Sequence, residues 1–174
     1  MIQNSIFKDP ALIGFLVKEL HKKDPDKQIG KTILQKMCYF LTQEGLTDFK
    51  YSMYHYGPYS SQVSGELGFA AASGLVIETW QKELGYFIEP GPKEPDFEHL
   101  VTEEEKRAID RITERYGRYN AIDMSIIATA IYHKKVFGVP DEKLADVVHS
   151  LKKKQNLSHI KKLLRDEGII EKDN

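Results

Sequence analysis

The order of helix and strand signals in the first 92 residues most constrains the fold of this chain. Asp9-Pro10 predicts the start of a helix, because aspartate caps helices and proline suits the first helical position. Apolar residues at helical spacing carry this helix to about Lys23. A second apolar pattern after Gly30 predicts another helix over residues 31–44.

The next segment predicts a strand and a third helix. Residues 51–56 are rich in aromatic side chains, which favour strands, and Gly57-Pro58 is expected to end the strand. Ser60 or Ser61 can cap the third helix, which we expect to reach Gly74.

Two β-rich runs follow at residues 75–80 and 86–89, and the polar turn between them predicts a hairpin. The order helix, helix, strand, helix, hairpin is that of a winged helix. Residues 91–95 are the best linker candidate, because two prolines there interrupt helices and sheets. We therefore predict a mainly α fold with a small β-hairpin or three-strand element (α+β). A winged-helix-like part, 1–92, is followed by a helical bundle, 93–174, packed on it as one compact unit.

Capping residues predict the helices of this second part. Thr102 with Glu105 forms a capping box, in which the side chain of each residue accepts a hydrogen bond from the backbone N–H of the other. Asn120 and Asp141 can cap the next two helices, and the apolar pattern of a last helix stops at Gly168.

Two motifs in the first part resemble those of a known family. The run Lys31–Tyr39 resembles the K-x-x-L-Q-K-x-x-Y helix of SocA-like Panacea antitoxins and their YwgA-like relatives, and is closer to the latter. Residues 54–60 resemble the family's Y-G-P-Y-S turn, and residues 73–76 its closing segment. Residues 119–133 resemble a later segment of the family more weakly. The resemblance implies a helical domain, in some members joined to toxin–antitoxin or prophage modules, that neutralises toxins by direct binding.

The motif residues have two interpretations. They could define only the fold, in which case Gln35 bonds the backbone of the Gly57-Pro58 turn. The fold-defining set is Lys31, Leu34, Gln35, Lys36, Tyr39, Gly57, Pro58, Tyr59, Ser60 and Gly74. Some could also contact a partner, since tyrosines combine apolar area with a polar hydroxyl. The partner-binding set is Gln35, Tyr39, Tyr54, His55, Tyr59, Ser64 and Gly68.

The third helix favours a protein partner. Between Ser60 and Gly74 there is no Lys or Arg, the side chains that read bases and phosphates in the major groove. Its small residues would let another helix or strand approach closely, or would let the helix pack beneath the C-terminal half; both interpretations stand. We therefore expect a non-enzymatic protein-binding module, with a toxin as one candidate partner.

A winged-helix DNA-binding regulator is the alternative. It would use Lys82 in the hairpin turn and the lysines at 134–135, 152–154 and 161–162. The net charge of −1 lacks the basic excess typical of nucleic-acid binding. Acidic residues also interleave with the C-terminal lysines, as on a solvated helix face.

Catalytic and metal-binding signatures are missing from the sequence. None of the six histidines stands at metal-ligand spacing with another His or Cys, and no phosphate loop or nucleophile elbow occurs. Cys38, the single cysteine, lies on an apolar helix face, where burial makes a thiol inert. We expect no enzyme activity, metal or cofactor, although a dispersed active site would leave no such signature. One cysteine, no signal peptide and no membrane span suggest the cytoplasm.

Overall fold

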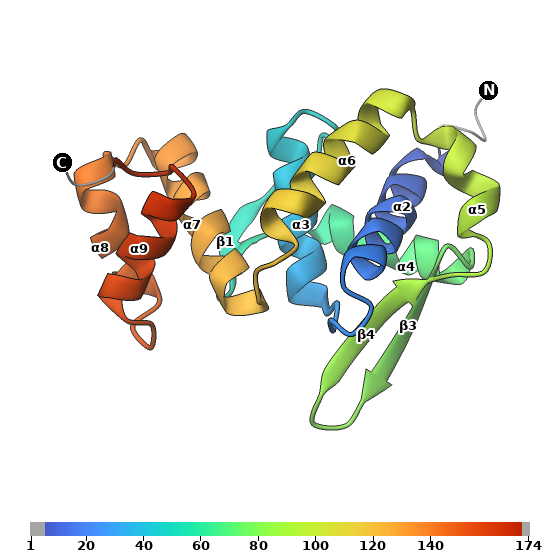
Figure 1. The fold of residues 1–174 in the computed structure, drawn as a ribbon, viewed down its shortest axis with the longest axis horizontal. Helices are drawn as coiled ribbons and strands as arrows, with labels where there is room; N and C mark the ends of the chain where they lie inside the picture. The colour runs from blue at the N-terminus through green and yellow to red at the C-terminus, as the bar shows by residue number, and fades with distance from the viewer. Residues whose placement is uncertain (1–5, 172–174) are drawn as a thin grey trace.

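A computed structural model describes residues 6–171 and places them in a mostly helical α+β fold, as the sequence predicted (Figure 1). Residues 1–5 and 172–174, which belong to the two predicted parts, lie outside the described residues. In chain order, the elements of the first part are α2 (Lys8–Lys23), α3 (Lys31–Gln43), β1 (Ser52–Tyr54), β2 (Gly57–Tyr59), α4 (Ser61–Ala72), β3 (Val76–Gln81) and β4 (Gly85–Pro90). Those of the second part are α5 (Glu94–Phe97), the 3-10 turn η1 (Glu98–Leu100), α6 (Glu103–Tyr116), α7 (Ala121–Phe137), α8 (Asp141–Leu151) and α9 (Leu157–Asp166).

The strands form two separate antiparallel pairs, not one three-strand element. Gly57-Pro58 does not end the first strand but returns the chain as β2, with Ser52 opposite Tyr59. A two-stranded sheet tolerates Pro58 because both its strands are edges. The pair β3–β4 is the hairpin that the sequence predicted, and it projects from the helical body (Figure 1).

Two helix starts differ from the prediction by one residue or more. The first helix begins at Lys8 and Asp9 lies in its first turn, so Asp9 is not the cap. The ring of the preceding Phe7 is anchored between Phe69 and Phe97, which fixes the helix start from outside the local sequence. Asp141 likewise lies in the first turn of α8 rather than capping it. The predicted caps by Ser60 and Asn120 and the Thr102 capping box are confirmed.

The core joins helices of both parts. Helices α2 and α3 pack against α6, where the rings of Phe40 and Tyr116 stack with centroids 3.9 Å apart. Helix α7 lies against α3 and β2, and α8 and α9 pack on α7 at the far end of the molecule (Figure 1). Among the described residues, no helix is both long and apolar enough to cross a bilayer.

The segment expected to be a linker, 91–95, is packed against the body. Gly91 N–H donates to Leu75 O at 2.8 Å, and Lys93 N–H donates to Gly74 O at 3.0 Å. Glu94 is buried, forms an ion pair with Lys18 at 3.2 Å and begins α5. Residues 91–95 are therefore fixed to the rest of the structure by these contacts and do not form a flexible linker.

Gly91 should tolerate no side chain at its position in this connection. A Cβ at Gly91 would lie 2.2 Å from the backbone oxygen of Gly74, so Gly91→Ala should lower the free energy of unfolding by at least about 2 kcal/mol. Gly65→Ala is the control, because nothing lies within 4 Å of its added methyl and alanine favours helices by about 1 kcal/mol. Urea denaturation measures both. Equal stability of Gly91→Ala and the wild type would mean that the segment is a loose linker.

Candidate partner-binding site

Gln35 joins helix α3 to the start of helix α4. Its side chain lies in α3 and is only 6% exposed. Its amide nitrogen donates to Ser60 O at 2.9 Å, and its amide oxygen accepts from Ser60 N–H at 3.0 Å. This double hydrogen bond, the Gln35 clamp, fixes the junction of β2 and α4, where Ser60 caps α4 through Val63 N–H. The bond that the sequence predicted from Gln35 to the Gly57-Pro58 turn is thus displaced, because Gln35 reaches Ser60, two residues beyond Pro58.

Lys36, the neighbour of Gln35 in α3, bonds the β1–β2 hairpin. The residue is 2% exposed, and its ammonium group donates to Pro58 O at 2.9 Å. Burial, with a smaller effect from nearby Lys152, lowers its pKa from the usual 10.5 to about 8. Gly57 lies at φ +95° and a Cβ there would meet the Thr129 hydroxyl at 2.7 Å, so the turn can press against α7 only with glycine.

Three tyrosines near Gln35 and Lys36 are exposed to solvent. Tyr54 is 61% exposed, Tyr56 67% and Tyr59 37%. The hydroxyl of Tyr59 is hydrogen-bonded to Ser64 Oγ at 2.9 Å, and Ser64 Oγ accepts from the Gln35 amide at 3.0 Å. Tyr59 is thus held in place by bonds that lead back to the core, and a ring fixed in advance loses little entropy when a partner covers it.

Two hollows flank the Tyr59 ring. The smaller, about 170 Å³, extends toward Tyr54 and Tyr56. The larger, about 320 Å³, extends along α4 to Ser64 and Gly68. We name these five residues, Tyr54, Tyr56, Tyr59, Ser64 and Gly68, the tyrosine face.

Helix α4 leaves one side open beside the tyrosine face. A Cβ placed on Gly65 or Gly68 would meet nothing within 4 Å. The helix packs on α2, α3 and β3. The interpretation that its small residues serve packing beneath the C-terminal half is therefore wrong, and they leave room for an outside chain instead.

Of the residues expected at a partner surface, Tyr54, Tyr59, Ser64 and Gly68 come together on the tyrosine face. His55 lies at the hairpin turn, with its ring edge-on to Tyr54 at 4.7 Å.

The other two expected contacts, Gln35 and Tyr39, are only 6% and 2% exposed, although Gln35 lines the floor of both hollows. Tyr39 packs edge-on against Tyr51 with ring centroids 5.0 Å apart. It therefore faces the core, and the motif alone did not indicate this orientation. Tyr56 was not among the predicted contacts; it lies in the turn between β1 and β2, outside both strands.

The remaining motif residues have structural places. Leu34 is in the core, and Gly74 turns the chain after α4 at φ +77°. Lys31 is exposed, pairs with Glu78 at 3.1 Å and lies over the Tyr86 ring at 3.7 Å, which ties α3 to the β3–β4 hairpin.

Cys38 and the histidines show no reactive grouping among the described residues. Cys38 is buried, and burial raises the pKa of its thiol to about 12, as the sequence predicted for an inert cysteine. Within residues 6–171 no three His, Cys, Asp or Glu side chains are grouped to hold a metal ion.

Comparison with known proteins gives one relative without a stated role. The chain is similar to the uncharacterized protein YwgA of Bacillus subtilis, with 27% identity over 143 residues that cover 78% of this chain and 82% of YwgA. No family model matches the chain. The expected likeness to YwgA is therefore supported.

The buried ammonium of Lys36 predicts a pH-dependent stability. Its folded pKa of about 8 lies below its unfolded value of 10.5, so the unfolded chain binds more protons between these pH values and the free energy of unfolding should rise with pH. The rise from Lys36 alone should reach at most about 3 kcal/mol by pH 10.5. Denaturation at pH 7.5 and 10 should show a smaller rise in Lys36→Met than in the wild type; equal rises would contradict it.

Proposed function

We propose that this protein binds another protein through the tyrosine face, in the manner of a Panacea-type antitoxin and without catalysing a reaction. The observation that carries the proposal is Tyr59, an accessible ring held by Ser64 and the Gln35 clamp between two hollows. Interface centres in known complexes are rich in such anchored aromatic residues.

The chemistry of the tyrosine face suits a polypeptide partner. Ring faces and small side chains provide apolar contact area, while hydroxyl groups at its centre can accept or donate hydrogen bonds to a backbone. The open side of α4 at Gly65 and Gly68 would allow a helix or strand of the partner to approach closely. One partner segment could therefore fill the hollow along α4 and cover Tyr59 at once.

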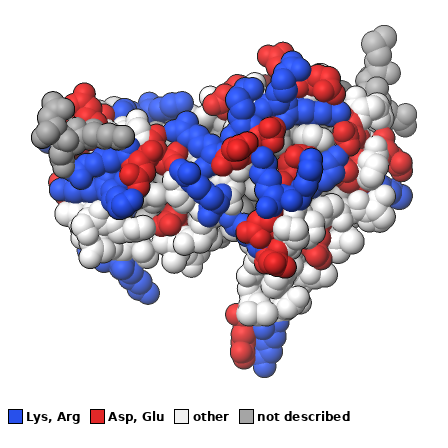
Figure 2. All heavy atoms as spheres, viewed as in Figure 1, with Lys and Arg blue, Asp and Glu red and all other residues white. Residues whose placement is uncertain are grey.

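Duplex DNA is the less supported partner. Helix α4 carries no cation, and Lys31 at the edge of both hollows is paired with Glu78. Figure 2 shows cationic and anionic side chains interleaved over the face that it displays, rather than a continuous basic strip. Two of the C-terminal lysines follow this pattern, in the pairs Lys134–Asp141 at 2.7 Å and Lys162–Asp166 at 2.6 Å.

The antitoxin part of the proposal rests on the motif resemblance. The Y-G-P-Y-S turn and the K-x-x-L-Q-K helix build the tyrosine face and its support, so the segments that resemble the family are those that would bind the partner. A cytoplasmic toxin encoded by a neighbouring gene is the first partner to test, and a reducing cytoplasm is compatible with the lone buried thiol.

Alanine substitution on the tyrosine face tests the proposal. The tagged chain is mixed with the product of each adjacent gene, and affinity is measured by calorimetry. Tyr54→Ala and Tyr59→Ala should each weaken the complex at least tenfold, because each removes an aromatic anchor. Phe137→Ala, which truncates a 62% exposed ring on α7, should leave affinity unchanged.

Two outcomes would contradict the proposal. One is a complex that Tyr54→Ala and Tyr59→Ala leave intact although both variants melt like the wild type. The other is salt-sensitive binding of duplex DNA with no protein partner, which would favour the regulator instead.

A further inference from the structure

Two lysines from distant parts of the chain lie behind the turn of the β1–β2 hairpin. Lys36 of α3 donates to Pro58 O, and Lys152, just after α8, donates to Ser125 Oγ at 2.7 Å. Ser125 in turn donates to Tyr56 O. Within residues 6–171, neither ammonium group lies within 4.0 Å of a carboxylate, and the charge of Lys152 acts on Lys36. Burial lowers the pKa of both lysines.

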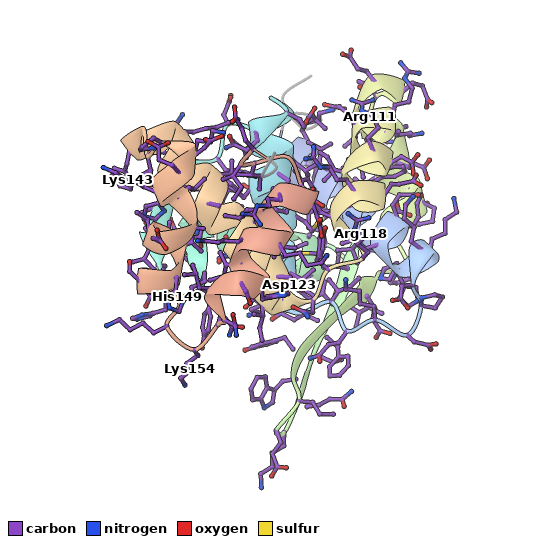
Figure 3. The ribbon with its side chains drawn as sticks, turned by 60° about the vertical axis from the view of Figure 1, so that its left-hand side comes forward. Arg111, Arg118, Asp123, Lys143, His149 and Lys154 are labelled. Atoms are coloured by element: carbon purple, nitrogen blue, oxygen red, sulfur yellow. The ribbon has the colours of Figure 1, made fainter. Side chains whose placement is uncertain are left out.

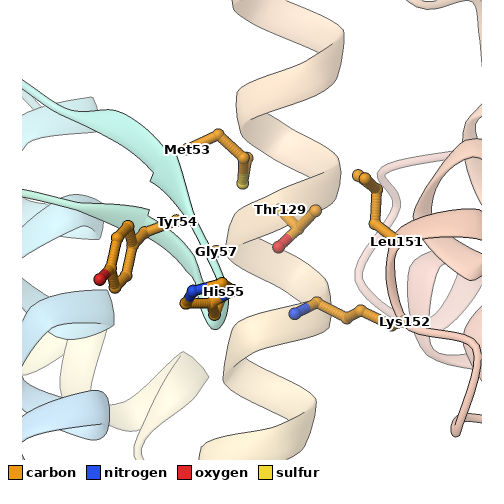
Figure 4. A pocket seen from close by; sticks show the side chains of 7 residues that line it. All are labelled: Met53, Tyr54, His55, Gly57, Thr129, Leu151 and Lys152. Carbon is orange, nitrogen blue, oxygen red and sulfur yellow. The ribbon is translucent and has the colours of Figure 1, made fainter.

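A hollow of about 330 Å³ opens beside this turn, between the turn and the end of α8, and Tyr54 also lines it (Figure 4). Lys152 and Thr129 reach toward it, Lys152 from the end of α8 and Thr129 from α7 (Figure 4). The Thr129 hydroxyl is buried and has no hydrogen-bond partner among the described residues. A buried hydroxyl without a partner is costly and calls for an explanation. His55 on the turn completes the polar lining.

The positive charge continues past this hollow. A second hollow of about 760 Å³ shares His55 and Lys152 with the first and adds Lys153 and Lys154 at its edge. Cations that line neighbouring concave surfaces reinforce one another's field and raise the local concentration of anions. The counter-ion that Lys152 lacks within the described chain can therefore come from outside it.

We propose that the hollow formed by Lys152, Thr129 and His55, here called the lysine pocket, binds an oxyanion. The Lys152 ammonium would contact the oxyanion directly, the Thr129 hydroxyl would donate a second bond, and Lys36 would add charge from behind the turn. The anion would supply the missing counter-ion for two desolvated ammonium groups. Carboxylate and phosphate share this chemistry, so the anion is either an acidic side chain of a bound protein or a free phosphate.

Titration of the isolated chain with inorganic phosphate at constant ionic strength tests the lysine pocket. In ¹H–¹⁵N NMR spectra, the Gly57, Thr129 and Lys152 amides should shift along saturable curves. Lys152→Met should weaken phosphate binding at least tenfold. Lys143→Met is the matched control, because it removes the same charge from an exposed site at the opposite end of α8 from Lys154 (Figure 3).

Thr129→Val keeps the test decisive if Lys152→Met fails to fold. It removes a hydroxyl that makes no described hydrogen bond, so the variant should fold and bind phosphate several-fold more weakly. Shifts that never saturate, or equal losses in Lys152→Met and Lys143→Met, would show only general attraction to basic side chains and would overturn the proposal.

A second titration with acetate separates the two sources of the anion. Saturable binding of acetate but not phosphate would assign the lysine pocket to an acidic side chain of a partner, and the reverse would assign it to free phosphate. Binding of neither would overturn the proposal. Since these titrations need no partner protein, their result is independent of the proposed function, and Tyr59→Ala should leave them unchanged.

Discussion

The Gln35 clamp is the interaction on which the motif region depends. One buried amide both donates to and accepts from the backbone of Ser60, at the point where β2 becomes α4. Removal of either group would leave a buried polar atom without its partner, at a cost of about 1–3 kcal/mol. The same amide holds Ser64, which holds Tyr59, so the position of an accessible ring is set inside the core.

The β1–β2 hairpin then has two sides with different chemistry. The tyrosine face presents aromatic rings and the small residues of α4. The lysine pocket opens where the turn meets α7 and the end of α8, and Tyr54 borders both. Gly57 allows the turn to pack closely against Thr129. The tyrosine face and the lysine pocket therefore both depend on Gly57 and on the hydrogen bonds of Gln35 and Lys36 to the hairpin. A protein partner that reached across the hairpin could contact both.

Local signals in the sequence predicted local structure well. The Thr102–Glu105 capping box and the Asn120 cap involve residues three apart, so their geometry is fixed by a single turn of helix. The return strand after Gly57 was missed because strand pairing depends on the partner strand and not on the glycine-proline dipeptide. Tyr39 was placed on the surface because a motif does not reveal which side of its helix meets the core.

The lysine pocket lay beyond sequence reasoning altogether. Its contacts join residues 27 and 69 positions apart, and nothing in the run Lys152-Lys153-Lys154 distinguishes the one lysine that turns inward. The start of α2 at Lys8 shows the same limit, since Phe7 is anchored by rings from α4 and α5. The sequence thus predicted the helices and four of the five residues of the tyrosine face, while contacts between distant segments decided the rest.

Hydrogen exchange of the Ser60 amide tests the Gln35 clamp most directly. In the wild type this amide should exchange as slowly as that of Met37 in the middle of α3, because its donor is buried and bonded to Gln35. In Gln35→Ala it should exchange much faster while Met37 stays protected. A Ser60 amide that exchanges in the wild type as fast as Glu83 at the exposed hairpin turn would contradict the clamp.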